Sequence, residues 1–137
     1  MFFKALGTLI LLSSCGGPND QAAILNLTHS PEQPNPGDTF VLSIAYDLKS
    51  SVTGGLATYS YKVNGLPFSP TVEDLCTQTE CPKEPGIYVE TTKSTWPSFS
   101  GSIVSKIQWT NQENEPVWCL QMNVSPSSSE HLRGTTN

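Results

Sequence analysis

Four cysteines, at positions 15, 76, 81 and 119, are the side chains whose type and spacing could do metal or redox chemistry. Cys76 and Cys81 are separated by four residues, whereas a zinc ribbon uses C-x2-C pairs, and no second close pair completes four ligands. In an exported chain an even set of cysteines favours disulfides. We therefore expect no metal or cofactor, a short loop closed by Cys76 and Cys81, and a remaining pair of Cys15 with Cys119.

Catalytic side chains are few, because His29 and His131 are the only histidines. A Ser-His-Asp or Cys-His site needs one of them, and the sequence has no G-x-S-x-G elbow. Two pairs of carboxylates have the right type for acid–base work: Glu73 with Asp74, and Glu113 with Glu115. They lie in polar stretches beside turn residues, where solvated loop charges are the ordinary explanation. The sequence predicts a protein that is not an enzyme.

The N-terminal residues have the order of a secretory signal peptide. A positive charge at Lys4 precedes an apolar run over 5–12, and small residues follow at 13–14. The run is too short for a transmembrane helix. We expect a signal peptide over 1–14, one folded domain over 15–126 and a polar, disordered tail over 127–137. A buried N-terminal strand is the weaker interpretation of the first segment.

The sequence Leu-Ser-Ser-Cys at 12–15 also fits a bacterial lipobox, in which Cys15 is acylated after cleavage. The two interpretations compete for the same thiol, because acylation of Cys15 leaves one other cysteine unpaired. The even cysteine count favours the disulfide. A membrane-anchored lipoprotein stays as an alternative.

Charge and length exclude several classes of protein. The formal net charge is −5, and only one of the seven lysines and arginines, Lys4, lies in the expected leader. The others are scattered singly rather than clustered, which argues against a nucleic-acid partner. At 137 residues the chain is long enough for one core, and no stretch after the leader is apolar enough to span a membrane.

The elements that must position these side chains are strands. Apolar and polar residues alternate with period two in four segments: 40–47, 57–63, 103–109 and 118–124. Residues 87–95, rich in β-branched side chains, are a further candidate. Turn-forming residues punctuate the chain: 34–38, 54–55, 64–67, 84–86 and 114–116. We predict an all-β sandwich of two antiparallel sheets with about seven strands.

Short segments along the chain, taken in their order and spacing, resemble the ML (lipid-recognition) family. They are Cys15-Gly16-Gly17, Leu27-Thr28-His29-Ser30-Pro31, Pro36-Gly37-Asp38-Thr39, Asn64-Gly65-Leu66-Pro67-Phe68, Asp74-Leu75-Cys76, Cys81-Pro82, Pro85-Gly86-Ile87-Tyr88, Ile107-Gln108-Trp109-Thr110 and Pro116-Val117-Trp118-Cys119-Leu120. Within the family, the chain is similar to the Niemann-Pick type C sterol carriers and to fungal phosphatidylglycerol/phosphatidylinositol transfer proteins.

The resemblance implies an immunoglobulin-like sandwich whose sheets splay apart to admit a sterol or phospholipid, with the disulfides Cys15–Cys119 and Cys76–Cys81. It implies a secreted or endosomal/lysosomal lumenal lipid carrier, a monomer that meets a membrane or a lipid-accepting protein transiently. Residues 30–36 contain no cysteine, where the animal sterol carriers have a small disulfide loop. This departure fits the fungal pattern better than a cholesterol carrier.

Apolar side chains on the expected inner faces of the sheets are the candidate lipid-binding residues. They are Phe40, Leu42, Tyr59, Tyr61, Ile103, Ile107 and Trp109. Phe68, Trp96 and Phe99 lie in proline-bounded loops and are the candidate rim, where they would touch membranes or partners. The inner-face residues would equally fill the solid core of an immunoglobulin-like extracellular module that binds proteins at its surface and has no lipid cavity.

Two N-glycosylation sequons are present, Asn26-Leu27-Thr28 and Asn123-Val124-Ser125. They matter if the host is eukaryotic. Pro126 directly follows the second sequon and makes Asn123 the weaker site.

Overall fold

The computed structural model describes residues 8–126, and these residues form nine β-strands. The strands are β1 (Thr8–Ser14), β2 (Ala22–Ser30), β3 (Thr39–Leu48), β4 (Gly55–Val63), β5 (Leu66–Pro67), β6 (Thr71–Asp74), β7 (Gly86–Thr95), β8 (Ile103–Asn111) and β9 (Pro116–Pro126). A short 3-10 helix, η2 (Leu75–Thr77), follows β6. No helix within residues 8–126 is long and apolar enough to cross a membrane.

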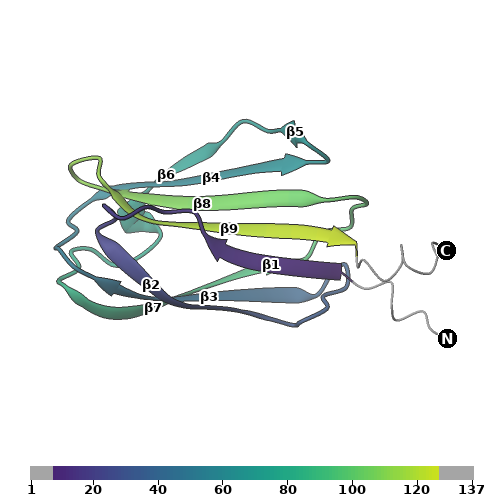
Figure 1. Cartoon of the computed structure of the whole chain (residues 1–137), viewed down its shortest axis with the longest axis horizontal. Coiled ribbons are helices and arrows are strands. Elements are labelled where there is room, and N and C mark those ends of the chain that lie inside the picture. Colours follow the sequence, from purple (N-terminus) through teal and green to yellow (C-terminus); the bar gives the residue numbers. More distant parts are fainter. Residues whose placement is uncertain (1–7, 127–137) are drawn as a thin grey trace.

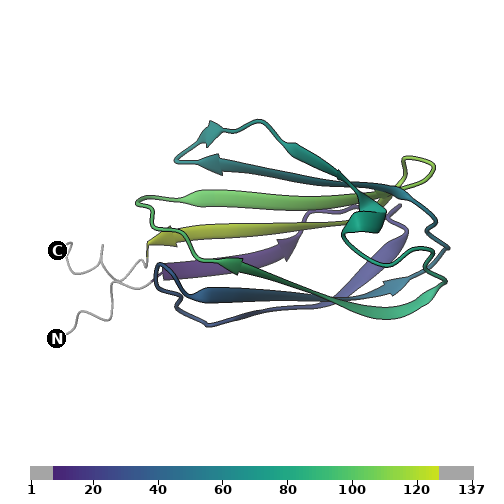
Figure 2. The ribbon, with the colours of Figure 1, turned by 180° about the vertical axis from the view of Figure 1, so that it is seen from behind.

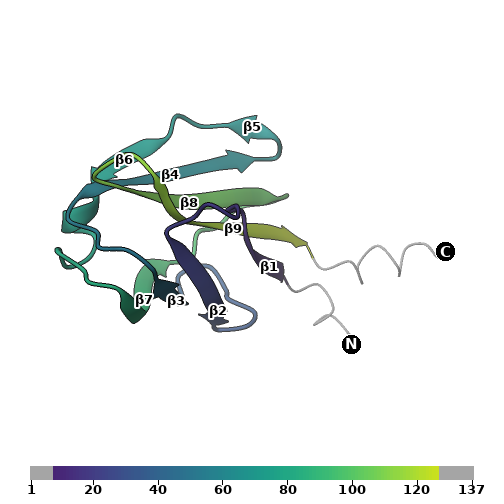
Figure 3. The same cartoon turned by 60° about the vertical axis from the view of Figure 1, so that its left-hand side comes forward.

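The strands form two antiparallel sheets that pack face to face (Figure 1). The larger sheet has the order β1-β9-β8-β4-β5, with β6 also paired to β4, and the smaller has the order β2-β3-β7. Figure 3 shows the two sheets as separate layers. The prediction of a two-sheet antiparallel sandwich is therefore confirmed.

Strand β3 illustrates how the sequence pattern makes the core. Its even-numbered residues, from Phe40 to Leu48, are buried, whereas the odd-numbered ones are at least partly exposed. Successive side chains of a strand point to opposite faces, so the buried set faces the larger sheet. In the larger sheet, the strand register likewise places buried side chains on one face, as where Ala57 lies opposite Trp109.

The two predicted disulfides, Cys15–Cys119 and Cys76–Cys81, are confirmed. The first ties the residue after β1 to the central part of β9, where the Cys15 amide also donates to the Cys119 carbonyl at 3.0 Å. The second closes the loop that contains η2. Figure 2 shows this loop lying between the two sheets at one end of the sandwich.

The nine strands exceed the expected number of about seven, and the sequence pattern did not predict β1 or the two short strands β5 and β6. Strand β1 occupies part of the expected signal peptide and pairs with β9 over its whole length, from Thr8 opposite Pro126 to Ser14 opposite Leu120. The uncleaved segment is thus compatible with the sheet, and its removal stays a prediction. Residues 1–7 and the expected disordered tail, 127–137, lie outside the described residues, as does His131.

Candidate functional site

The space between the sheets is lined by apolar side chains from both. Six of the seven predicted inner-face residues belong to the core or pack against it: Phe40, Leu42, Tyr59, Ile103, Ile107 and Trp109. Tyr61 differs, because its side chain is partly exposed and its ring stacks on Phe68, with the ring centroids 5.1 Å apart. The alternation therefore identified the correct face, but not how far the lining extends along β4.

An aromatic cluster fills the centre of this space. The Trp109 and Trp118 rings, opposite each other on β8 and β9, have centroids 4.4 Å apart. Tyr46 approaches both rings at 6.1 Å and stacks on Tyr88 at 5.7 Å. The indole Nε1 of Trp118 is buried and has no hydrogen-bond partner among the described residues. The deep interior thus combines this aromatic cluster with aliphatic side chains such as Ile44, Leu48 and Leu120.

Tyr46 and Trp118 were not among the sequence-predicted site residues, although the signal was present. Tyr46 continues the even-numbered series that begins at Phe40 on β3. Trp118 pairs with Trp109 once the turn at residues 112–115 is read as a hairpin. Continuing the β3 series as far as Tyr46, and pairing Trp118 with Trp109 across the turn, would have found both residues.

The predicted rim residues separate into two groups. Trp96 is only 6% exposed, because its amide donates to the Asp38 carbonyl at 2.8 Å and its ring packs on Phe40 at 4.7 Å. Phe99 is half-buried beside it, with a centroid distance of 6.2 Å. The prediction that Trp96 lies on an exposed rim was therefore wrong. Backbone hydrogen bonds to Gly37 and Asp38, which are distant in the sequence, hold Trp96 against the core.

Phe68 remains an exposed residue, in the hairpin that β4 forms with β5. It is 50% exposed, and Leu66 next to it is 70% exposed. A groove on the outer face of the larger sheet runs beside this hairpin and contains two lysines. Its lining residues are Ser60, Tyr61, Lys62, Pro67, Phe68, Val104, Lys106 and Gln121. The hairpin tip thus combines apolar and cationic side chains.

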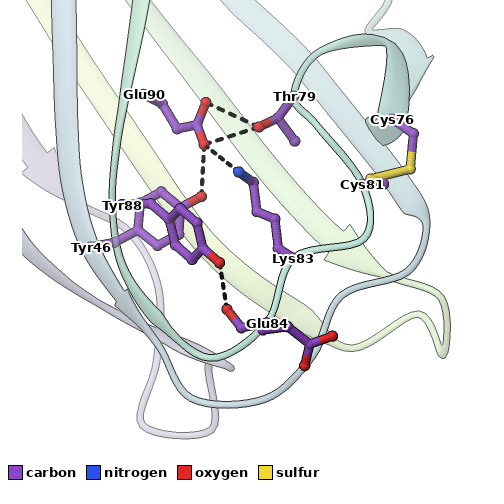
Figure 4. Close-up of polar contacts among 8 residues, drawn as sticks. All are labelled: Tyr46, Cys76, Thr79, Cys81, Lys83, Glu84, Tyr88 and Glu90. Carbon is purple, nitrogen blue, oxygen red and sulfur yellow. Dashed lines mark hydrogen bonds and ion pairs between the residues drawn. A yellow bond between two sulfur atoms is a disulfide. The ribbon is translucent and has the colours of Figure 1, made fainter.

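A largely buried polar cluster centred on Glu90 joins β3, β7 and the loop closed by Cys76 and Cys81 (Figure 4). The Tyr46 hydroxyl donates to Glu90 Oε2 at 2.8 Å, and the Thr79 hydroxyl donates to the same carboxylate at 3.0 Å. Lys83 Nζ lies 3.3 Å from Glu90 Oε2 and 4.3 Å from the centroid of the Tyr88 ring. Burial, reinforced by Glu90, raises the pKa of the Tyr46 hydroxyl well above its ordinary value.

This cluster fastens the Cys76–Cys81 loop to both sheets. Thr79 and Lys83 hold it to β7 through Glu90, and the Tyr59 hydroxyl of β4 donates to Gln78 Oε1 at 2.9 Å. Burial and the nearby Glu73 raise the pKa of Tyr59. The loop therefore closes one end of the gap between β4 and β7.

Farther along β7 the inner face of the strand is less covered. Thr92 and Ser94 pair with Leu42 and Phe40 and so share their inward face, yet both are exposed. An inward-facing side chain that remains exposed has no cover from the opposite sheet. The margin between β7 and the β4–β5 edge is thus less covered than the end closed by the Cys76–Cys81 loop.

The predicted carboxylate pairs serve local structure. Asp74 caps η2, since its Oδ1 accepts from the Cys76 amide at 2.9 Å. At the β8–β9 turn, Asn111 Oδ1 accepts from the amides of Glu113 and Glu115, and Asn111 Nδ2 donates to Glu115 Oε1 at 3.0 Å.

His29 is half-buried beside Phe40, with ring centroids 5.5 Å apart. Within residues 8–126 no group of three or more metal-ligating side chains comes together.

Two antiparallel sheets with apolar inner faces, held by two disulfides, match the lipid-recognition domain that the sequence predicts. A family model described as "ML domain" matches residues 10–125. The chain belongs to the ML-domain family.

Two curated relatives are named as lipid transfer proteins. The chain is 34% identical over 82 residues to "Putative phosphatidylglycerol/phosphatidylinositol transfer protein 1" of Dictyostelium discoideum, an overlap of 58% of this chain and 54% of the relative. It is 32% identical, with the same coverage of each chain, to "Putative phosphatidylglycerol/phosphatidylinositol transfer protein 3" of that organism. The chain thus spans about half the length of the curated relatives it matches.

Solved structures share the fold. A Niemann-Pick type C2 protein from the Japanese carpenter ant superposes with a TM-score of 0.63 at 13% identity, covering 82% of this chain and 96% of that one. Chicken MD-1 complexed with lipid IVa gives a TM-score of 0.65 at 19% identity, covering 88% and 91%.

Proposed function

We propose that the protein is a lipid carrier that holds the hydrocarbon part of a sterol or phospholipid between its two sheets. The observation that supports this most strongly is the apolar lining contributed by both inner faces, from Phe40 and Leu42 on one sheet to Ile107 and Trp109 on the other. Burying hydrocarbon is favourable by about 0.8 kcal/mol per methylene, so a long acyl chain gains on the order of 10 kcal/mol before binding costs.

The lipid enters at the less covered margin between β7 and the β4–β5 edge. Because aliphatic and aromatic side chains fill the interior of the described structure, the sheets must move apart and these side chains must shift to make room. The end near η2 is held together by the Glu90 cluster and the Cys76–Cys81 loop, so the movement is largest at the Thr92 and Ser94 end.

The β4–β5 hairpin is the part of the carrier that meets a membrane. Leu66 and Phe68 are apolar and exposed, and Lys62 and Lys106 line the adjacent groove. A lysine near an anionic bilayer contributes about 1 kcal/mol of attraction, while the apolar side chains insert between headgroups. Contact at the hairpin brings the entrance close to the donor or acceptor bilayer.

The carrier works outside the cytosol, as a monomer in a secreted or endosomal/lysosomal lumenal space. Two disulfides persist in oxidising compartments and are rare in reducing ones. The Cys15–Cys119 bond also occupies the thiol that acylation would require.

A vesicle-to-vesicle transfer assay tests the membrane-contact step. Replacing both Leu66 and Phe68 with Ser should slow transfer of a fluorescent phospholipid or sterol between anionic vesicles while leaving the amount bound per protein unchanged. Ile87→Ser is the matched control, because Ile87 is equally exposed, at 70%, but lies on the outer face of the other sheet. Equal slowing by the control would refute a specific role for the hairpin.

A further inference from the structure

The outer face of the smaller sheet carries exposed aliphatic side chains with no partner in the described structure. Ile87 is 70% exposed and Val89 is 66% exposed, both on the edge strand β7. Their neighbour Tyr88 points inward, so these two side chains point to solvent. Exposed apolar surface of this kind marks a contact site or a risk of aggregation.

The first sequon lies within this patch. Register places Asn26 opposite Ala45, and Ala45 opposite Val89, so the three side chains form one row across the outer face. Leu25, the extra residue of the β2 bulge and itself exposed, adjoins the row. We define the β2–β7 patch as Leu25, Ala45, Ile87 and Val89. Two strand spacings, about 9–10 Å, separate Asn26 from Val89.

We propose that Asn26 carries an N-linked glycan whose first sugars lie across the β2–β7 patch. Asn26 and Thr28, the two essential sequon residues, are both exposed and share the outer face of the edge strand β2. The stem of an N-glycan is long enough to reach Val89, and the apolar faces of its sugar rings pack on aliphatic side chains. The glycan thereby covers surface that would otherwise be open to water.

The donor is an oligosaccharide linked to a polyprenyl pyrophosphate in the secretory membrane of a eukaryotic host. The Asn26 amide nitrogen bonds to the anomeric carbon of the sugar and gives up one proton to a base of the transferase. The bond from that carbon to the pyrophosphate oxygen breaks, and the polyprenyl pyrophosphate leaves with the bonding electrons.

The second sequon lies in a different setting. Asn123 is on the interior strand β9, between Leu11 of β1 and Val104 of β8, and its Oδ1 accepts from Gln121 Nε2 at 3.0 Å. Pro126 follows the sequon directly. The structure thus assigns the modification to Asn26 and leaves Asn123 unmodified.

Secretion of the full chain from eukaryotic cells, behind an independent leader, tests the site without relying on the chain's own N-terminus. Glycopeptide mass spectrometry should find Asn26 occupied and Asn123 bare. An unmodified Asn26 in the secreted protein would overturn the assignment. The inference rests on the proposed lumenal location and not on lipid binding, so lipid retention by the same sample tests the proposed function separately.

A second measurement tests the role of the glycan. Asn26→Gln and Thr28→Ala should each raise the fluorescence of a dye that binds apolar surface severalfold and should promote self-association in sedimentation experiments. Adding Ile87→Thr and Val89→Thr to Asn26→Gln should return both signals to those of the glycosylated protein, and Asn123→Gln should change neither. Unchanged dye binding and sedimentation after loss of the glycan would overturn the covering role.

Discussion

Glu90 is the side chain that links the polar and apolar parts of the interior. Its carboxylate is mostly buried and accepts hydrogen bonds from Tyr46 and Thr79 while it pairs with Lys83. A buried charge is tolerated only when such partners replace water. Because Tyr46 also packs on both core tryptophans, the carboxylate positions an aromatic ring at the centre of the proposed lipid site.

Replacing Lys83 with Met should lower the free energy of unfolding by about 3 kcal/mol, because the Glu90 charge then stays buried without its cation. Denaturant titration followed by tryptophan fluorescence measures the change. In the double variant Lys83→Met/Glu90→Gln the unpaired charge is gone, and most of the lost stability should return. A double variant as unstable as Lys83→Met would show that packing of the lysine chain, not the charge pair, matters.

Tyr46 should make the protein sensitive to alkali. Its folded-state pKa is raised by burial and by Glu90, so the stabilisation is complete below the unfolded-state value of about 10 and is lost as the pH rises above it. Unfolding free energies measured between neutral pH and pH values above about 10 should fall more steeply for the native protein than for Tyr46→Phe. Parallel curves for the two proteins would contradict the assignment of this titration.

At the scale of elements, the two disulfides have different consequences because they close loops of different length. Their sequence separations are 104 residues for Cys15–Cys119 and 5 for Cys76–Cys81. On the chain-entropy model, removing the first pair should cost about 5 kcal/mol and removing the second about 2 kcal/mol. Thermal or chemical denaturation of the two double-alanine variants compares them. Equal losses would indicate that strain or residual unfolded structure outweighs loop entropy.

The sequence predicted the long strands that alternate clearly and β7, which is rich in β-branched residues, and it missed β1, β5 and β6 for physical reasons. Every second residue of β3 is buried, so its period-two pattern is clear. The sequences of β4, β8 and β9 also alternate, although four successive residues of β9, 117–120, are buried. Strand β1 has the composition of a leader, and β5 has only two residues, too few for a pattern. These local signals cannot show which partner strand is available.

The candidate site was predictable to a similar degree. Inner-face residues such as Phe40 and Ile107 follow from alternation within a strand. Trp96 was misplaced because its burial depends on hydrogen bonds to a loop that is distant in the sequence, at Gly37 and Asp38. The Glu90 cluster depends on tertiary contacts among three separate segments, and no local pattern marks it.

For the molecule as a whole, the margin beside β7 is the proposed route of the lipid to the interior. Thr92→Trp together with Ser94→Trp should obstruct it and slow lipid uptake about tenfold, equivalent to a barrier of about 1.4 kcal/mol. Thr91→Trp is the matched control, because Thr91 is also exposed but points to the opposite face of β7. Stopped-flow uptake of a fluorescent lipid distinguishes them. Equal rates in all three proteins would place the entrance elsewhere.

The central claim is that the two sheets enclose a lipid, and native mass spectrometry of the secreted protein tests it most directly. The protein is exposed to a mixed extract of sterols, phospholipids and fatty acids, separated from free lipid, and its retained ligand is released and identified. We expect one lipid per protein and the same secondary structure with and without it. A folded protein that retains none of these lipids would contradict the account and would favour an immunoglobulin-like interaction module with a closed core.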